Sequence, residues 1–443
     1  MKLNEEFSRQ KTVKIQKIFL LINLAVFVDT LLYGIIVPVV PYYAARLGIS
    51  PGGVGVIFAA YSAGLLLAGV PMGLACDRYG YKPVLLPGML GLTLSTVLFA
   101  FSGNFLMLTV SRLLQGIASA ATWSAGLALV ASLYPTHLRG QKMGLVMTST
   151  GLGTIAGPVL GGVLYQYTGY LFPFLLTAVV GAVLSVLLWR YPLPKIKSIP
   201  GQGRQPGIKM LRDRNILWSV AVTVVGSFGF GLLEPLLPVD LNHRFGLTSA
   251  GTGALFGALS LAFALCQPVI GHLSDRWGRK PLLVGGLLAT AAIAPWLGKA
   301  PTLGVEALLL VFLGMVSGTS SATALPMLAD ATEGLANNVA SGLKTEAACS
   351  NGSMYGTAYG IINTAYSLGL MAGPLIGTLI ALRWNLTVAL TFYSLLLALT
   401  AVGVSRQLKE NEPFPSRPCL RLFPRRPRCS PLASLLTRTS RNQ

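Results

Sequence analysis

Residues 73–83 read GLACDRYGYKP and residues 271–281 read GHLSDRWGRKP, so one pattern of Gly, Asp, Arg and Lys occurs twice, 198 positions apart. Two further pairs of segments occur in the same order. VPVVP at 37–41 matches EPLLP at 234–238, and IAGPVLG at 155–161 matches MAGPLIG at 371–377. Three matched landmarks in one order are hard to obtain by chance. They predict a chain built from two repeats in the same orientation.

The segments between these landmarks are long and apolar. The 443 residues are 53% hydrophobic and 11% charged, with a mean hydropathy of +0.64. Residues 54–76 contain no charge and are long enough to cross the ~30 Å of a bilayer's hydrocarbon core. No cleavable A-x-A site follows the first apolar run, which therefore reads as a span and not as a signal peptide. The predicted spans are 18–41, 54–76, 83–102, 105–134, 144–165, 171–190, 216–240, 250–273, 281–299, 305–328, 353–381 and 385–404.

The expected fold class is thus an all-α membrane protein with twelve transmembrane helices in two parallel six-helix repeats. We expect a first bundle over 1–190, a cytoplasmic linker over 191–215 and a second bundle over 216–404. The linker is rich in Pro, Gly, Lys and Arg. The basic tail, 405–443, is predicted to be disordered. A binding site is expected near the midplane between the two bundles.

Basic residues set the predicted orientation. If residues 1–17 are cytoplasmic, all but five of the 34 lysines and arginines fall in cytoplasmic segments or the tail. This positive-inside bias places both termini in the cytoplasm. The net charge of +20 is therefore assigned to topology and lipid headgroups, and no nucleic-acid partner is expected. The exceptions are Arg46, Arg244, Lys299 and Arg383 on the outside and Arg112 within a span.

Metal, cofactor and enzyme functions find no support in the sequence. The five cysteines form no C-x-x-C pair, and the three histidines are scattered at loop edges. Neither an H-E-x-x-H nor a G-x-S-x-G motif occurs. We therefore expect no metal, no cofactor and no catalytic residues.

Charged residues inside the predicted spans are the strongest functional signal. Asp29 interrupts IFLLINLAVFVDTLLYGIIVPVV, and Glu234 interrupts VAVTVVGSFGFGLLEPLLPV. A carboxylate at such a depth costs at least ~2.5 kcal/mol, so these two are predicted to bind a cation, a proton or both. Pro235 frees a backbone carbonyl one turn earlier, which we expect to accept from the protonated acid of Glu234. Arg112 needs a partner or water by the same argument, unless its side chain snorkels to the outer interface.

The repeated motifs resemble the major facilitator superfamily over essentially all the spans. The two G-x-x-x-D-R segments resemble that superfamily's signature between spans two and three and its copy between spans eight and nine. The resemblance implies a cytoplasmic gate, in which glycines let helices approach and the acids cap helices or pair with arginines. A simple basic turn is the alternative. The implied gating residues are Gly73, Asp77, Arg78, Gly80, Asp275 and Arg276.

Two further motifs point within the superfamily. Residues 111–116, SRLLQG, resemble a motif of proton-coupled exporters. Residues 153–162, GTIAGPVLGG, resemble the signature of antiporters, although close packing of small residues would also explain them. The residues of this antiporter motif are Gly153, Gly157, Pro158, Gly161 and Gly162.

A narrower resemblance is to the vesicular amine transporters and their bacterial drug-exporting relatives. It rests on FVDTLL at 27–32, LLEPLLP at 232–238 and SMYGTAYGIIN at 353–363. It implies that Asp29 recognises a substrate ammonium and that Glu234 takes part in transport. The chain departs from the eukaryotic members at Ser317 and Asn363, where they carry Asp. It also lacks their glycosylated loop between spans one and two, which favours a bacterial exporter in the cytoplasmic (inner) membrane.

We therefore expect a proton-coupled antiporter that exports lipophilic, cationic or amine-like compounds, as in multidrug efflux. Its expected partners are a small-molecule substrate, protons and the bilayer, and the protein is expected to be monomeric. A proton-coupled symporter or facilitator for sugars or other small metabolites is the alternative, and the direction of substrate movement separates the two. Aromatic residues including Tyr33 and Trp123 are candidates for cation–π contact with the substrate. The substrate- and proton-binding candidates are Asp29, Glu234, Arg112, Asn363, Tyr33 and Ser317.

Overall fold

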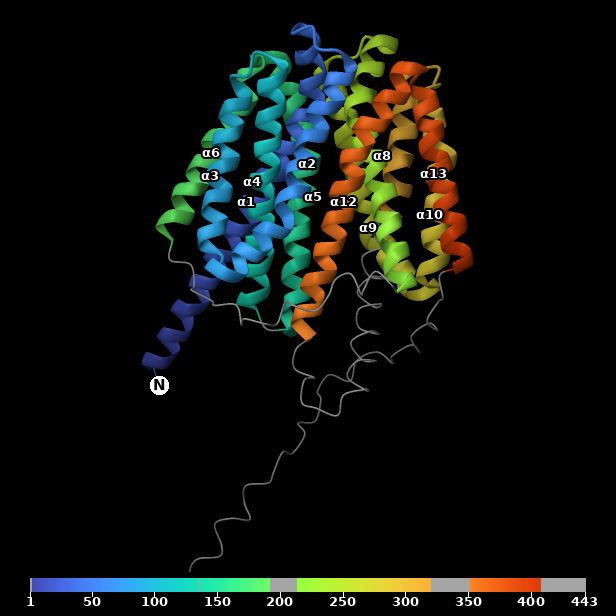
Figure 1. The fold of residues 1–443 in the computed structure, drawn as a ribbon. Coiled ribbons are helices and arrows are strands. Elements are labelled where there is room, and N and C mark those ends of the chain that lie inside the picture. Colours follow the sequence, from blue (N-terminus) through green and yellow to red (C-terminus); the bar gives the residue numbers. More distant parts are fainter. Residues whose placement is uncertain (1, 135, 192–212, 320–350, 408–443) are drawn as a thin grey trace, which may run out of the picture. The chain divides into compact units, whose positions relative to one another are not determined.

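The structure is a computed structural model, which describes residues 2–134, 136–191, 213–319 and 351–407. Within these ranges the regular structure is helical and no strand occurs. The helices are α1 (Lys2–Arg46), α2 (Pro51–Tyr79), α3 (Lys82–Ala100), α4 (Phe105–Leu133), α5 (Thr136–Thr168), α6 (Leu171–Arg190), α8 (Arg214–Phe245), α9 (Ser249–Trp277), α10 (Arg279–Ile293), η1 (Ala294–Trp296), the helix Leu303–Thr319, α12 (Asn351–Arg383) and α13 (Leu386–Gln407) (Figure 1).

These helices confirm the predicted fold class. Ten helices of the described ranges are long and apolar enough to cross a membrane. The shorter α10, continued by η1, and the helix Leu303–Thr319 fall in the predicted ninth and tenth spans. Every predicted span therefore contains a helix. The clearest difference is α1, which begins at Lys2, well before the predicted residue 18.

Polar caps and glycines set the helix ends. Side chains of Ser50, Asn104, Asp213 and Thr248 accept from backbone N–H groups in the first turns of α2, α4, α8 and α9. At the end of α8, Gly246 has a φ of 62°, a left-handed conformation that favours glycine. Short, capped turns of this kind reverse the chain between successive helices.

Helix pairing follows the repeat. In the first half α2 packs on α4 and α1 packs on α5, and in the second half α8 packs on α12 and α10 packs on α13. Across the halves, α5 packs on α9 and α2 packs on α12. Residues Met1–Glu410 form one compact unit, and the division into bundles at 190 and 216 stays a prediction. The predicted linker and tail lie mostly outside the described residues.

The turns between helices lie at two opposite ends of the helix bundle, the distal end and the proximal end. The distal end holds the turns at residues 47–50, 101–104 and 246–248, and it is drawn at the top of Figure 1. The proximal end holds the turns at residues 80–81 and 278.

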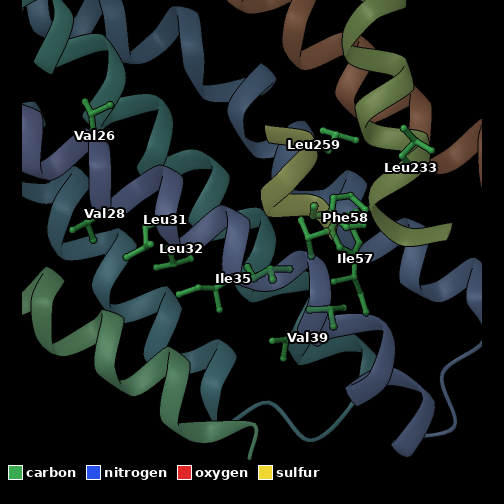
Figure 2. Packing of buried hydrophobic residues seen from close by; sticks show 14 of the residues in the cluster. Val26, Val28, Leu31, Leu32, Ile35, Val39, Ile57, Phe58, Leu233 and Leu259 are labelled. Atoms are coloured by element: carbon green, nitrogen blue, oxygen red, sulfur yellow. The ribbon is translucent and has the colours of Figure 1, made fainter. Parts of the chain in front are cut away.

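The buried core extends across both halves. Figure 2 shows apolar side chains of one buried cluster, among them Ile35 of α1, Phe58 of α2, Leu233 of α8 and Leu259 of α9. Residues 25–41 of α1 are buried apart from Phe27 and Tyr33, which are half-buried. Any charged group in this part of α1 is therefore far from water and has to find partners within the protein.

Candidate functional site

Asp29 lies within this buried part of α1, with 2% of its surface exposed. Its Oδ2 accepts hydrogen bonds from the Ser119 hydroxyl (2.8 Å) and from Nε1 of Trp123 (2.6 Å). The two donors are one turn apart on α4 and so share a face of that helix. Within the described residues, Oδ1 of Asp29 is buried and has no hydrogen-bond partner. One carboxylate oxygen is thus held by α4, while the other is left as an acceptor.

Arg112 lies two turns before Ser119 on α4 and is fully buried. Its Nη1 donates to Oε1 of Gln115 (3.1 Å), and Nε2 of Gln115 donates to the Thr96 hydroxyl (3.3 Å). In the part of the chain that the structure describes, Nε and Nη2 of Arg112 have no acceptor. The alternative in which Arg112 snorkels to the outer interface does not hold, because its side chain is enclosed by protein.

Aromatic rings surround the Arg112 guanidinium. It lies 4.5 Å from the ring centroid of Tyr61, 5.4 Å from that of Tyr33 and 6.0 Å from that of Phe58. Desolvated cation–π contacts of this kind are worth ~2 kcal/mol or more. They stabilise a buried cation without neutralising its charge.

Glu234, in the middle of α8, is also buried. Its Oε2 accepts a hydrogen bond of 2.5 Å from the hydroxyl of Tyr33, which lies one turn after Asp29 on α1. This hydrogen bond joins the two halves of the chain. The sequence predicts the backbone carbonyl freed by Pro235 as a partner of Glu234, whereas the partner seen in the structure is the Tyr33 hydroxyl.

The structure brings together four of the six predicted binding residues. Arg112 interacts electrostatically with Asp29 and with Glu234. Among the described residues, no Arg112 nitrogen lies within 4.0 Å of either carboxylate. Tyr33 packs against Tyr61, with 4.9 Å between ring centroids. The result is a buried cation near two buried carboxylates, neither of which forms a salt bridge with it among the described residues.

The other two predicted binding residues are placed differently. The Ser317 hydroxyl donates to the carbonyl of Leu313 in its own helix (2.6 Å). The Asn363 side chain, on α12, is exposed. One turn later on α12, Tyr366 interacts electrostatically with Glu234. The binding roles of Ser317 and Asn363 stay predictions.

The glycines of residues 153–162 let α5 approach two other helices. A Cβ at Gly157 would lie 2.7 Å from Cα of Gly34, and a Cβ at Gly161 would lie 2.6 Å from the Ile35 carbonyl oxygen, both in α1. At Gly162 a Cβ would clash with the carbonyl oxygen of Ser249 in α9, in the other half. The Ser249 hydroxyl in turn donates to the Gly162 carbonyl (3.1 Å).

Further contacts join the halves at the distal end. The Tyr42 hydroxyl donates to the Leu247 carbonyl (2.8 Å) and lies 2.9 Å from the Thr252 hydroxyl. The Ala250 N–H donates to Oε1 of Gln166 (3.4 Å). Where α2 meets α12, a Cβ at Gly55 would lie 2.9 Å from the Pro374 carbonyl oxygen. The two halves are therefore closed against each other at the distal end.

Three glycines nearer the proximal end have no such close neighbours in the other half. A Cβ at Gly73 of α2, Gly151 of α5 or Gly271 of α9 would meet nothing within 4 Å. In this conformation the close approach predicted for Gly73 is therefore not seen. The glycine contacts between the halves, as far as the structure describes them, lie between the site and the distal end.

The predicted gate residues lie at the proximal turns. Gly80 and Gly278 each have a φ of 89°, which favours glycine there. The Arg78 guanidinium lies over the ring of Tyr79 (5.3 Å), and Arg276 is exposed. The side chains of Asp77 and Asp275 lie outside what the structure describes, so their gating role stays a prediction.

Three buried residues that contact charged groups were not predicted from the sequence. Ser119 contacts Asp29, and Phe58 contacts Arg112. Neither could be recognised as a site residue from the sequence, because uncharged residues are common in membrane spans. Among the described residues Glu306 is a third buried carboxylate, with Oε2 3.6 Å from Nη1 of Arg244. Its charge gave no signal because it stands near the start of a predicted span.

Comparison with known proteins agrees with this fold. The chain matches the family profile of the Major Facilitator Superfamily over residues 22–239 and again over 220–435. The MFS-type transporter SLC18B1 of Mus musculus is 30% identical over 358 residues, which are 78% of this chain and 76% of that protein. The chromaffin granule amine transporter of Homo sapiens is 29% identical over 330 residues, which are 73% of this chain and 59% of that protein.

Solved structures show the same fold. A bacterial homologue of the human lysosomal transporter Spinster, in an inward-facing and occupied conformation, gives a TM-score of 0.72 at 13% identity, over 88% of this chain and 96% of that one. The nucleoside transporter NupG gives 0.69 at 12% identity, over 88% of this chain and 100% of that one. Together with the helices and the two family matches, these findings show that the chain belongs to the Major Facilitator Superfamily and is a multi-pass membrane transporter with relatives among the amine transporters.

Proposed function

We propose that this transporter is a proton-coupled antiporter that exports lipophilic cations or amine-like compounds. The observation that carries the proposal is the pair of buried carboxylates, Asp29 and Glu234, one from each half, grouped with Arg112 without a salt bridge to it. The unpartnered Oδ1 of Asp29 suits the N–H of an ammonium group or the charge of a larger cation. Relatives named as amine transporters support this substrate class.

Exchange follows from competition for negative charge. A substrate cation and a proton each neutralise a carboxylate, so binding of one disfavours binding of the other. The half-buried ring of Tyr33, which already lies near a guanidinium, offers an aromatic surface to a lipophilic cation. Coupling further requires that the empty, deprotonated site disfavours the switch between the two conformations.

We place the proximal end and both termini in the cytoplasm of a bacterial cell, in its cytoplasmic (inner) membrane. The excess of basic residues in the proximal segments supports this orientation. The distal contacts then lie on the outer side, so the structure corresponds to an inward-facing state. We further propose that the protein works as a monomer of two bundles, 1–190 and 216–404.

The direction of proton movement tests this function. The purified protein is reconstituted in liposomes with an acidic lumen, a pH-sensitive dye inside and tetraphenylphosphonium, a lipophilic monocation, outside. For the antiporter we expect uptake of the cation together with alkalinisation of the lumen. A symporter would instead take up its substrate only when the outside is acidic. Absence of any cation-dependent proton movement would overturn the proposal.

The antiporter motif yields a prediction about the distal closure. Gly162→Leu is expected to reduce transport to near the background of protein-free liposomes, because its side chain would collide with the Ser249 carbonyl and prevent closure. Gly151→Leu is the matched control, since the same change on the same helix meets nothing within 4 Å. Initial rates of tetraphenylphosphonium uptake at equal protein density measure both. Equal rates for the two variants would contradict the packing argument.

Asn363 yields a prediction about specificity. If its exposed side chain faces the transport pathway, Asn363→Asp adds a third carboxylate near the site and should improve the export of dications relative to monocations. Resistance to a dicationic and a monocationic antiseptic, measured in one exporter-deficient host, gives this ratio. Asn363→Cys should react with a water-soluble thiol reagent. An active Asn363→Cys protein that resists the reagent would remove Asn363 from the pathway.

A further inference from the structure

The hydrogen bonds between the two halves differ in whether their acceptor can be protonated. In the described residues, Tyr42, Ser249 and Ala250 make such bonds at the distal end, and the partners of all three are carbonyl, hydroxyl or amide groups. The Tyr33–Glu234 hydrogen bond is the one whose acceptor gains and loses a proton. Its strength therefore depends on protonation, while the strengths of the others do not.

The Tyr33 hydroxyl is held firmly in position. Its ring packs against Tyr61 of α2 and lies beneath the guanidinium of Arg112 of α4. The titratable and charged groups that interact with Tyr33 or Glu234 are Arg112, Tyr61 of α2 and Tyr366 of α12. Within the described parts of the chain, Asp29, one turn away on α1, is hydrogen-bonded only to α4. Protonation of Asp29 therefore changes no described hydrogen bond between the halves.

We propose that Tyr33 is a positioning residue that links the protonation of Glu234 to the conformation of the transporter. As long as Glu234 is ionised, the hydrogen bond from the Tyr33 hydroxyl to Glu234 holds α1 against α8 in the distally closed conformation. This hydrogen bond between the halves is the tie. A hydrogen bond to a carboxylate is about twice as strong as one between neutral groups, so protonation of Glu234 lowers the ratio of closed to open forms about fivefold. The inference rests on the proposed function, because it gives that exchange its coupling step.

The tie prevents the empty transporter from changing to the outward-open conformation. With no substrate and no proton bound, the ionised Glu234 holds the distal end closed, so the empty carrier does not open outward. A proton on Glu234, or a substrate cation that pairs with the Glu234 carboxylate, weakens the same hydrogen bond and releases the switch. Without the tie, empty carriers open outward, take up a proton and carry it inward, which is a proton leak without substrate.

Spin labels at the distal end test the tie directly. Tyr167 of α5 and Trp384 after α12 are exposed, with 77% and 65% of their surface accessible, and belong to different halves. In a cysteine-free background, the distance distribution between labels at these positions gives the ratio of closed to open forms without substrate. For the otherwise unchanged protein we expect this ratio to fall about fivefold between high and low pH.

Tyr33→Phe should lower the ratio at high pH and abolish its pH dependence. Tyr42→Phe is the matched control, because it also removes a hydroxyl that joins the halves but one whose acceptors are neutral. We expect a lower ratio at every pH for Tyr42→Phe, with the pH dependence kept. Should Tyr33→Phe fail to fold, Glu234→Gln serves in its place. At every pH, this variant should show the ratio of closed to open forms that the unchanged protein has at low pH. A retained pH dependence in either variant overturns the proposal.

A dye-based flux assay provides the functional readout. Liposomes with Tyr33→Phe should show a larger proton leak without added substrate than those with Tyr42→Phe, which keep the hydrogen bond to Glu234. A tight Tyr33→Phe protein would overturn the link between the tie and coupling. If the unchanged protein shows the pH-dependent distances but no exchange of tetraphenylphosphonium for protons, the proposed function fails while the tie stands.

Discussion

Asp29→Asn is expected to weaken the binding of tetraphenylphosphonium by about 30-fold or more, because removing one charge from a buried, charged contact costs at least ~2 kcal/mol. The asparagine oxygen can still accept from Ser119 and Trp123, which both bond to Oδ2 of the carboxylate. The amide NH₂ then takes the place of the unpartnered Oδ1. The site thus keeps its shape but turns a donor, not an acceptor, toward the cation. Equilibrium binding to the purified protein measures the loss.

A control variant separates loss of the site from loss of the fold. Asp240→Asn makes the same chemical change at a carboxylate near the distal end of α8, where Asp240 pairs with Arg244 (2.8 Å). We expect Asp240→Asn to bind tetraphenylphosphonium as the unchanged protein does. Unchanged binding by Asp29→Asn at normal expression would remove Asp29 from the site.

The fold could be predicted almost completely, because the apolar interior of a bilayer permits few kinds of spanning structure. Long uncharged segments such as 54–76 allow no other structure, and the repeated GLACDRYGYKP and GHLSDRWGRKP segments give the two halves. What could not be predicted are the extensions beyond the hydrocarbon core. In α1, residues 2–17 are polar enough for either a helix or a loop, and apolarity alone does not decide between them.

The charged members of the site were predictable for the same reason. Asp29, Glu234 and Arg112 stand out because a charge within an apolar helix is costly. Their partners could not be predicted, since whether Ser119 or Trp123 reaches Asp29 depends on how α1 and α4 are rotated against each other. The Tyr33–Glu234 hydrogen bond joins residues 201 positions apart, and nothing in either span indicates the other.

Glu234→Gln is expected to abolish proton-driven accumulation of tetraphenylphosphonium while downhill exchange continues. The glutamine carbonyl can still accept from the Tyr33 hydroxyl, so the buried hydroxyl keeps a partner. The amide cannot bind and release a proton, so the two halves of the cycle are no longer linked to the proton gradient. Accumulation should fall to the level of protein-free liposomes. Exchange of internal for external labelled cation, at equal pH on both sides, should remain measurable.

Comparison of the two carboxylate variants assigns the two roles. Asp29→Asn should lose both accumulation and exchange because the cation no longer binds, whereas Glu234→Gln should lose accumulation alone. This division follows from their surroundings. Asp29 has an oxygen without a partner and hydrogen bonds within the first half, while Glu234 is bonded to the other half. If proton-driven accumulation survives in Glu234→Gln, Asp29 carries the proton as well as the cation, and exchange arises from competition at that single carboxylate.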